Sequence, residues 1–154
     1  MTATQQTEIK QRLLKECLRI QQQQIDTAKS AMDEAQESAN EQQGSMEDKF
    51  ESFREAMQIQ RDMFAKQLAE AVNGLAMLKR IVVTKESKDA ALGAVVITDS
   101  SKYFLALSLG EIDLDGEKYF AISPVSPLGK AMIGKKEKET FEFRDKKFKI
   151  KSIF

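Results

Sequence analysis

The first 82 residues of this 154-residue chain contain no proline and only two glycines, Gly44 and Gly74. Apolar and small residues recur there in steps of three or four, the spacing of a coiled-coil seam. One stripe consists of Ile9, Leu13, Cys17, Ile20, Gln24, Ala28, Met32, Ala35 and Ala39. A second consists of Met46, Phe50, Phe53, Met57, Gln60, Phe64, Leu68, Ala71, Leu75, Leu78 and Val82. The pattern predicts two long helices, over about residues 5–42 and 46–82.

Gly44 and Ser45 lie between the two stripes. Glycine readily adopts the left-handed conformation just past a helix end, and serine is a good N-cap, so the pair predicts a turn. Asp48 stands three residues after Ser45 and is placed to complete a capping-box-like pair. Two helices of matched length joined by a short turn are expected to pack antiparallel. The glutamine run at residues 21–24 is expected on their solvated surface.

The rest of the chain has a different composition. Both prolines and five of the seven glycines lie after residue 92, together with the β-branched and aromatic clusters. Strands are predicted at 92–98, 103–109, 119–122, 140–143 and 148–153, with turns at 99–101, 115–116 and 145–146. Ser126, Pro127 and Gly134 predict one short helix. The expected fold is α+β: an antiparallel coiled-coil hairpin over residues 1–84, then a small β domain over residues 85–154.

The chain has no histidine and a single cysteine, Cys17. The missing histidine excludes histidine-activated nucleophiles and most zinc sites, and one cysteine excludes an internal disulfide. Cys17 lies on the first stripe and is therefore expected to be a buried core residue, not a reactive thiol. No apolar run approaches the roughly 18 residues of a membrane span, and the N-terminus lacks a signal-peptide pattern. A cytoplasmic protein without membrane contact is expected.

The 24 basic and 24 acidic residues balance in number but not in position. Residues 33–51 contain seven acidic residues and one lysine, whereas residues 130–151 contain nine basic and four acidic residues. The acids on the turn suit binding of a hard cation such as Mg²⁺, although Glu47 and Asp48 equally suit compensation of a helix dipole. The basic region is explained equally well by protection of a sheet edge or by contact with RNA or an acidic protein surface.

Residues 122–136 read Ile-Ser-Pro-Val-Ser-Pro-Leu-Gly-Lys-Ala-Met-Ile-Gly-Lys-Lys. This segment resembles the C-terminal signature of the bacterial Gre (GreA/GreB) transcript-cleavage factors, in which an extended I-S-x-x-S-P segment leads into a short helix that ends at I/L-G-K. The order of parts is also similar, with a helical hairpin followed by a small FKBP-like β domain. The resemblance covers essentially the whole chain and is most specific in the second domain.

The resemblance implies a transcription elongation factor that binds RNA polymerase beside its secondary channel. The β domain would dock on the channel rim, and the basic domain would be able to contact nascent RNA. The docking candidates are Ser123, Pro124, Ser126, Pro127, Leu128, Lys130, Gly134 and Lys135. The hairpin would enter the channel and present Glu47, Asp48 and Glu41 around the turn at Gly44 and Ser45.

In the family, acids at this turn help to hold a second Mg²⁺ at the polymerase active site, where the polymerase cuts its own backtracked transcript. The resemblance thus makes Glu47 and Asp48 metal-assisting candidates for an ion shared with the polymerase. The chain alone would bind no cofactor and would have no active site of its own. It is expected to be a monomeric accessory factor and not an enzyme.

The turn departs from the family pattern, which reads roughly G-D-L-x-E-N-A-E-Y. With Gly44 aligned on the glycine, Ser45 stands at the first acid and Asp48 at the second. Stimulation of cleavage and channel binding that regulates or inhibits without cleavage therefore both stay open. A coiled-coil interaction scaffold is a further alternative. A prolyl isomerase would rest on the FKBP-like fold alone, and fold alone does not carry function.

Overall fold

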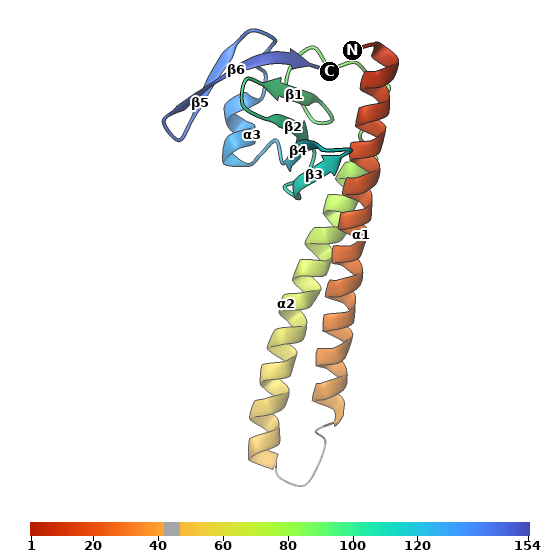
Figure 1. Ribbon diagram of the computed structural model, residues 1–154. Coiled ribbons are helices and arrows are strands. Elements are labelled where there is room, and N and C mark those ends of the chain that lie inside the picture. Colours follow the sequence, from red (N-terminus) through yellow and green to blue (C-terminus); the bar gives the residue numbers. More distant parts are fainter. Residues whose placement is uncertain (42–46) are drawn as a thin grey trace. The chain divides into compact units, whose positions relative to one another are not determined.

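The computed structural model describes residues 1–41 and 47–154, with side chains for all of these except residues 41 and 47–50. Two long helices are followed by a six-stranded mixed sheet with one short helix, which confirms the predicted α+β class (Figure 1). By compactness the chain forms two units, Ile20–Ala76 and a second that combines Met1–Arg19 with Met77–Phe154. The predicted domain boundary at residues 84 and 85 stays a prediction. None of the described helices is both long and apolar enough to cross a membrane.

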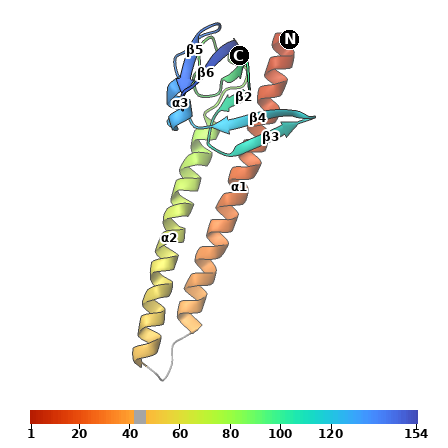
Figure 2. The same cartoon turned by 60° about the vertical axis from the view of Figure 1, so that its left-hand side comes forward.

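The unit of residues 20–76 contains most of helix α1 (Ala3–Glu41) and of helix α2 (Glu47–Lys79). The two helices run side by side in this unit, as Figures 1 and 2 both show. The buried apolar residues of α1 here are Ile25, Ala28, Ala35 and Ala39, three of which carry only a methyl group. Small side chains on one helix allow the backbone of the other to approach closely.

The predicted seam of α1 is wrong at one turn of the helix. Gln24 is exposed, whereas Gln21, which was expected on the solvated surface, is only 4% exposed. The side-chain amide of Gln21 donates a hydrogen bond of 2.8 Å to the backbone carbonyl of Ala71 in α2. The contacting face passes from Cys17 through Gln21 to Ile25, in steps of four residues. A buried amide is tolerated there because it has a partner.

Helix α2 ends earlier than predicted, at Lys79. The amides of Arg80 and Ile81 bond to carbonyls three residues back, at 3.1 Å each, which tightens the last turn of the helix. This turn buries Ile81 and leaves Val82 61% exposed, so the prediction that Val82 lies on the seam is wrong.

The other unit contains the sheet. Its strands are β1 (Val95–Thr98), β2 (Lys102–Leu105), β3 (Gly110–Leu114), β4 (Glu117–Ile122), β5 (Thr140–Phe143) and β6 (Lys146–Ile153). They are ordered β3-β4-β2-β1-β6-β5, and every neighbouring pair is antiparallel except β2 with β4. Helix α3 (Pro127–Met132) lies between β4 and β5 in the chain.

The β3–β4 and β5–β6 hairpins of this sheet turn at residues with positive φ. Asp115 and Gly116 connect β3 to β4 with φ of 55° and 89°, as the sequence predicts. The β5–β6 turn uses Arg144 and Asp145, one residue earlier than predicted, with φ of 51° and 61°. Strand β3 was not predicted, because glycine and aspartate have low strand propensity. It forms by pairing along its whole length with β4.

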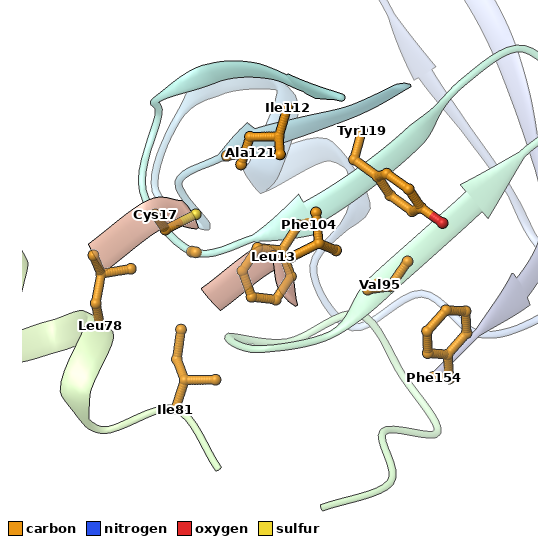
Figure 3. Packing of buried hydrophobic residues seen from close by; sticks show 11 residues of the cluster. Leu13, Cys17, Leu78, Ile81, Val95, Phe104, Ile112, Tyr119, Ala121 and Phe154 are labelled. Carbon is orange, nitrogen blue, oxygen red and sulfur yellow. The ribbon is translucent and has the colours of Figure 1, made fainter. Parts of the chain in front are cut away.

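The sheet is covered on both faces. On one face Leu13 and Cys17 of α1 pack with Leu78 and Ile81 against a cluster that includes Phe104 (Figure 3). On the other face Met132 of α3 packs in a cluster with buried apolar residues of the strands, which include Val96, Leu105, Phe148 and Ile150. Full burial of a leucine such as Leu13 or Leu78 contributes about 1.5–3 kcal/mol. The ends of both long helices are therefore part of the core that supports the sheet.

Candidate docking segment and acidic turn

The segment that connects β4 to α3 is fixed by serine hydrogen bonds. The Ser123 amide donates to the hydroxyl of Ser108 at 3.1 Å, and the Ser123 hydroxyl accepts from the Val125 amide at 3.2 Å. Ser108 lies in the loop between β2 and β3, far from Ser123 in sequence. The segment is therefore held both by its own side chains and by a neighbouring loop.

Ser126 caps α3 in the way the sequence predicts. Its backbone is extended, with φ −67° and ψ 159°, and its hydroxyl accepts from the Gly129 amide at 3.1 Å. The same hydroxyl donates to the carbonyl of Ser123 at 2.6 Å. Pro127 takes the first position of the helix, where its missing amide hydrogen leaves no bond unmade. One hydroxyl thus joins the helix start to the extended segment before it.

Gly129 allows the extended segment to lie directly on the helix. A Cβ atom at this position would lie 2.0 Å from the carbonyl oxygen of Ser123 and 3.0 Å from backbone atoms of Pro124. No side chain fits, since all three nearest atoms belong to backbone that cannot swing aside. The sequence offered no sign of this close approach, although Gly129 stands in the signature.

The end of α3 is tied to the chain before β1. Gly134 has φ 79° and lies just past the helix, as predicted. Its amide donates to the Ala90 carbonyl at 2.9 Å, and the Ala90 amide donates to the Lys135 carbonyl at 2.8 Å. These two bonds fix where residues 134–135 leave the helix.

The docking candidates present apolar and cationic groups on this fixed backbone. Val125 and Ile133, which were not among the docking candidates, lie on the same segment and are 75% and 42% exposed. Pro127 and Lys130 are exposed as well. The half-buried candidates are Ser123, Pro124, Ser126, Leu128 and Lys135. Exposed apolar side chains on a rigid segment suit binding to the surface of another macromolecule.

The predicted acidic turn lies mostly outside the described residues. Glu41 is the last residue of α1, and Glu47 and Asp48 are the first two residues of α2. The side chains of these three acids, and Gly44 and Ser45 altogether, are outside the described part of the chain. Their convergence on a metal therefore stays a prediction. Among the side chains that are described, no three acidic or cysteine groups come close enough to hold a metal ion.

The sequence of the second part decides the family. Residues 82–153 match the family model described as "Transcription elongation factor, GreA/GreB, C-term". These residues belong to the GreA/GreB C-terminal family. The match includes the whole sheet and the signature segment at residues 122–136, so the resemblance noted in the sequence is confirmed for this part of the chain.

Two solved structures match over most of the length of the chain. One is the GreA factor homolog 1 (Gfh1) protein of Thermus thermophilus, with 21% identity and a TM-score of 0.35, covering 89% of this chain and 94% of that chain. The other is titled as the transcription factor Gfh1, with 20% identity and a TM-score of 0.34, covering 88% and 92%. A comparison with curated proteins gave no match. The family assignment rests on residues 82–153.

Two buried groups beneath the GreA/GreB domain are structural. Cys17 is fully buried, and burial raises the pKa of its thiol to about 12, so it is not a nucleophile at neutral pH. Lys10 is 3% exposed and donates through Nζ to the Lys85 carbonyl at 2.9 Å. Burial lowers the pKa of Lys10, and Glu86 partly opposes that shift. The lysine thus ties α1 to the segment that follows α2.

A groove of about 700 Å³ lies between α1 and α2 within residues 20–76. Its lining consists of Ile20, Gln21, Gln23, Gln24, Thr27, Ala28, Ala31, Phe64, Gln67, Glu70 and Ala71. One carboxylate and one threonine hydroxyl among amides and apolar groups provide neither an acid–base pair nor an activated nucleophile. This groove therefore has the chemistry of helix packing and not of a catalytic site.

Proposed function

We propose that this chain is a transcription elongation factor that binds RNA polymerase at its secondary channel. The observation that carries the proposal is the GreA/GreB C-terminal domain at residues 82–153, preceded by two helices of 39 and 33 residues. Factors of this family are non-catalytic accessory factors of RNA polymerase. The chain would act as a monomer, in the cytoplasm where the polymerase works.

The GreA/GreB domain would dock on the rim of the channel through the segment between β4 and β5. Val125 and Ile133 would supply apolar contacts, and Lys130 a cationic one, since all three are exposed. Ser123, Ser126 and Gly129 would set the shape of the segment without needing to touch the polymerase. Mutations can therefore be directed either at residues that contact the polymerase or at residues that only position the segment.

The hairpin would enter the channel and carry the acidic turn toward the polymerase active site. Carboxylate oxygens are the ligands that Mg²⁺ prefers, which makes Glu47, Asp48 and Glu41 the candidates for assisting a polymerase-held ion. Ser45 stands where the family pattern has its first acid. Two outcomes are therefore compatible with binding: stimulation of transcript cleavage, or occupation of the channel that regulates or inhibits elongation without cleavage.

Binding is tested by size-exclusion chromatography of the chain with core RNA polymerase at low salt. The wild-type chain should co-migrate with the enzyme, and alone it should have the mass of one 17.4 kDa chain by light scattering. Val125→Asp together with Ile133→Asp should weaken co-migration, because both changes place a charge in an apolar contact. The matched control is Val82→Asp together with Leu92→Asp, two exposed apolar residues outside both long helices and outside the docking segment. A wild-type chain that never co-migrates with the polymerase would refute the proposal.

The two versions of the function are separated with a backtracked elongation complex and Mg²⁺. Cleavage stimulation would produce shortened transcripts with the wild-type chain, and Glu47→Ala combined with Asp48→Ala would abolish them. Slower elongation without shortened transcripts would identify the regulatory version. In that version, Ser45→Asp restores the family acid and is expected to confer some cleavage.

A further inference from the structure

Lys10 is buried without a carboxylate partner. The residue is 3% exposed, and lysines are almost never fully buried unless they are paired. Across the described residues, none of the ion pairs within 4 Å includes Lys10. Its Nζ donates one hydrogen bond, to the Lys85 carbonyl at 2.9 Å. An ammonium group has three hydrogens to donate, so the structural bond to Lys85 leaves two of them for other acceptors.

Lys10 lies in the wall of a small pocket within the unit that contains the sheet. The pocket has a volume of about 140 Å³, and its walls come from the first turns of α1, from residues 83–86 and from Phe154. Because Lys85 is both a wall residue and the acceptor of the Lys10 bond, the ammonium group lies at the side formed by residues 83–86. One water molecule takes about 30 Å³, whereas drug-sized ligands occupy pockets of about 300 Å³ or more. The pocket therefore has room for a small ion but not for a nucleotide.

The polar groups around the pocket are mainly hydrogen-bond donors. Besides the Lys10 ammonium group, they include the side-chain amide of Gln6 and the hydroxyls of Thr7 and Thr84. Among the described residues that line the pocket, Glu86 is the only one with a carboxylate side chain, and it is exposed. Burial lowers the pKa of Lys10 more than the charge of Glu86 raises it. The charge of the buried ammonium group is therefore compensated only in part by the chain itself.

We propose that this pocket binds a small oxyanion, of the size of inorganic phosphate or acetate, beside the Lys10 ammonium group. The oxygens of the anion accept the remaining hydrogens of Lys10 and those of the hydroxyls, and such charge-assisted bonds are stronger than bonds between neutral groups. A water molecule accepts the same hydrogens but leaves the buried charge uncompensated. Since the walls belong to α1 and to the segment after α2, the bound anion joins the two and stabilises this unit.

The test follows thermal unfolding of the full chain by tyrosine fluorescence, because both tyrosines are buried in the unit that contains the pocket. The probes are inorganic phosphate and acetate, each compared with chloride at the same pH and ionic strength. A ligand that binds only the folded chain stabilises it by mass action, so a tenfold excess over its Kd should raise the Tm by about 3–8 °C. The result is independent of the proposed function, since no docking candidate lines the pocket.

Two variants change the charge at the pocket in opposite directions. Lys10→Met keeps a long apolar side chain and removes the charge, so the rise in Tm with the anion should be lost. Lys15→Met, at an exposed lysine of the same helix, is its matched control and should keep the rise. Glu86→Gln removes a repelling carboxylate and should increase the affinity for the anion about two- to fivefold, the size of an interaction between partly exposed charges. Glu142→Gln, at another exposed glutamate of the same unit, should leave the affinity unchanged.

The inference is supported if an oxyanion raises the Tm of the wild type above its value in chloride and Lys10→Met removes that rise. If Lys10→Met does not fold, a tighter response of Glu86→Gln supports it instead. A response to phosphate alone identifies a phosphate site, and a response to acetate alone a carboxylate site. The inference is overturned if neither anion exceeds chloride, or if a folded Lys10→Met keeps the rise, which would indicate general exclusion of the salt from the protein surface. Where Lys10→Met does not fold, an unchanged affinity of Glu86→Gln overturns it.

Discussion

Replacement of Gly129 by alanine is the sharpest test of the docking segment, because two effects predict opposite changes in the free energy of unfolding. Alanine is favoured over glycine within a helix by about 1 kcal/mol, so helix propensity alone predicts stabilisation. The added Cβ would lie 2.0 Å from the Ser123 carbonyl oxygen, whereas ordinary contact begins at 3.4 Å. The Ser123 carbonyl would therefore have to move by more than an ångström.

The expected result is a net loss of stability. Forcing an extra carbon into a packed site costs about 1–3 kcal/mol. Displacing the Ser123 carbonyl also breaks the bonds that it accepts from the hydroxyl and the amide of Ser126, each worth about 1 kcal/mol. After the helix gain is subtracted, Gly129→Ala is expected to lower the free energy of unfolding by about 2–4 kcal/mol.

Urea unfolding followed by tyrosine fluorescence measures this change. The chain has no tryptophan and two tyrosines, Tyr103 and Tyr119, both buried in the sheet, so the signal reports the unit that contains α3. Gly134→Ala is the control: its φ is 79° with no atom within 4 Å of the added carbon, so it tests backbone strain alone, about 1–2 kcal/mol. An unfolding midpoint of Gly129→Ala above that of the wild type would refute the predicted close approach.

Three further changes test other parts of the structure. Ser126→Ala removes the N-cap of α3 and is expected to cost about 1–2 kcal/mol in the same unfolding experiment, with no loss if the cap is absent in solution. Gln21→Glu places a carboxylate against the Ala71 carbonyl and should cost at least about 2 kcal/mol at pH 7, measured by thermal unfolding; an equal effect of Gln24→Glu would contradict the corrected seam. The folded chain holds the Cys17 thiol proton up to a pKa of about 12, whereas the unfolded chain releases it near 9, so the free energy of unfolding should fall as pH rises above 9; Cys17→Ala should remove that part of the fall.

The docking segment shows which structural features a local sequence pattern predicts and which it does not. Ser126, Pro127 and Gly134 gave the start and end of α3 correctly, because capping and positive φ depend on residues next to each other in the chain. The close approach at Gly129 and the bond from Ser123 to Ser108 were not predicted. Both depend on backbone that turns back on itself or comes from another loop, and no residue pattern reports such a distance.

Helix packing also has features that the local sequence predicts and features that depend on tertiary contacts. The steps of three and four residues determined that two long helices form and roughly where each begins and ends. They did not determine that Gln21 is buried and Gln24 exposed, or that Ile81 and not Val82 enters the core. A period of 3.6 allows neighbouring stripes to compete, and only the partner surface selects between them.

The sequence by itself determined the α+β class, the two long helices, the short capped helix and the family of residues 82–153. It did so because propensity, periodicity, capping and signature residues act over a few neighbouring positions. Only the tertiary structure decided that β3 is a strand, that β6 pairs with β5 in its first half and with β1 in its second, and that Arg144 occupies a left-handed turn. These features arise when segments distant in sequence pair, because pairing decides which side chains are covered and which remain exposed to bind a partner.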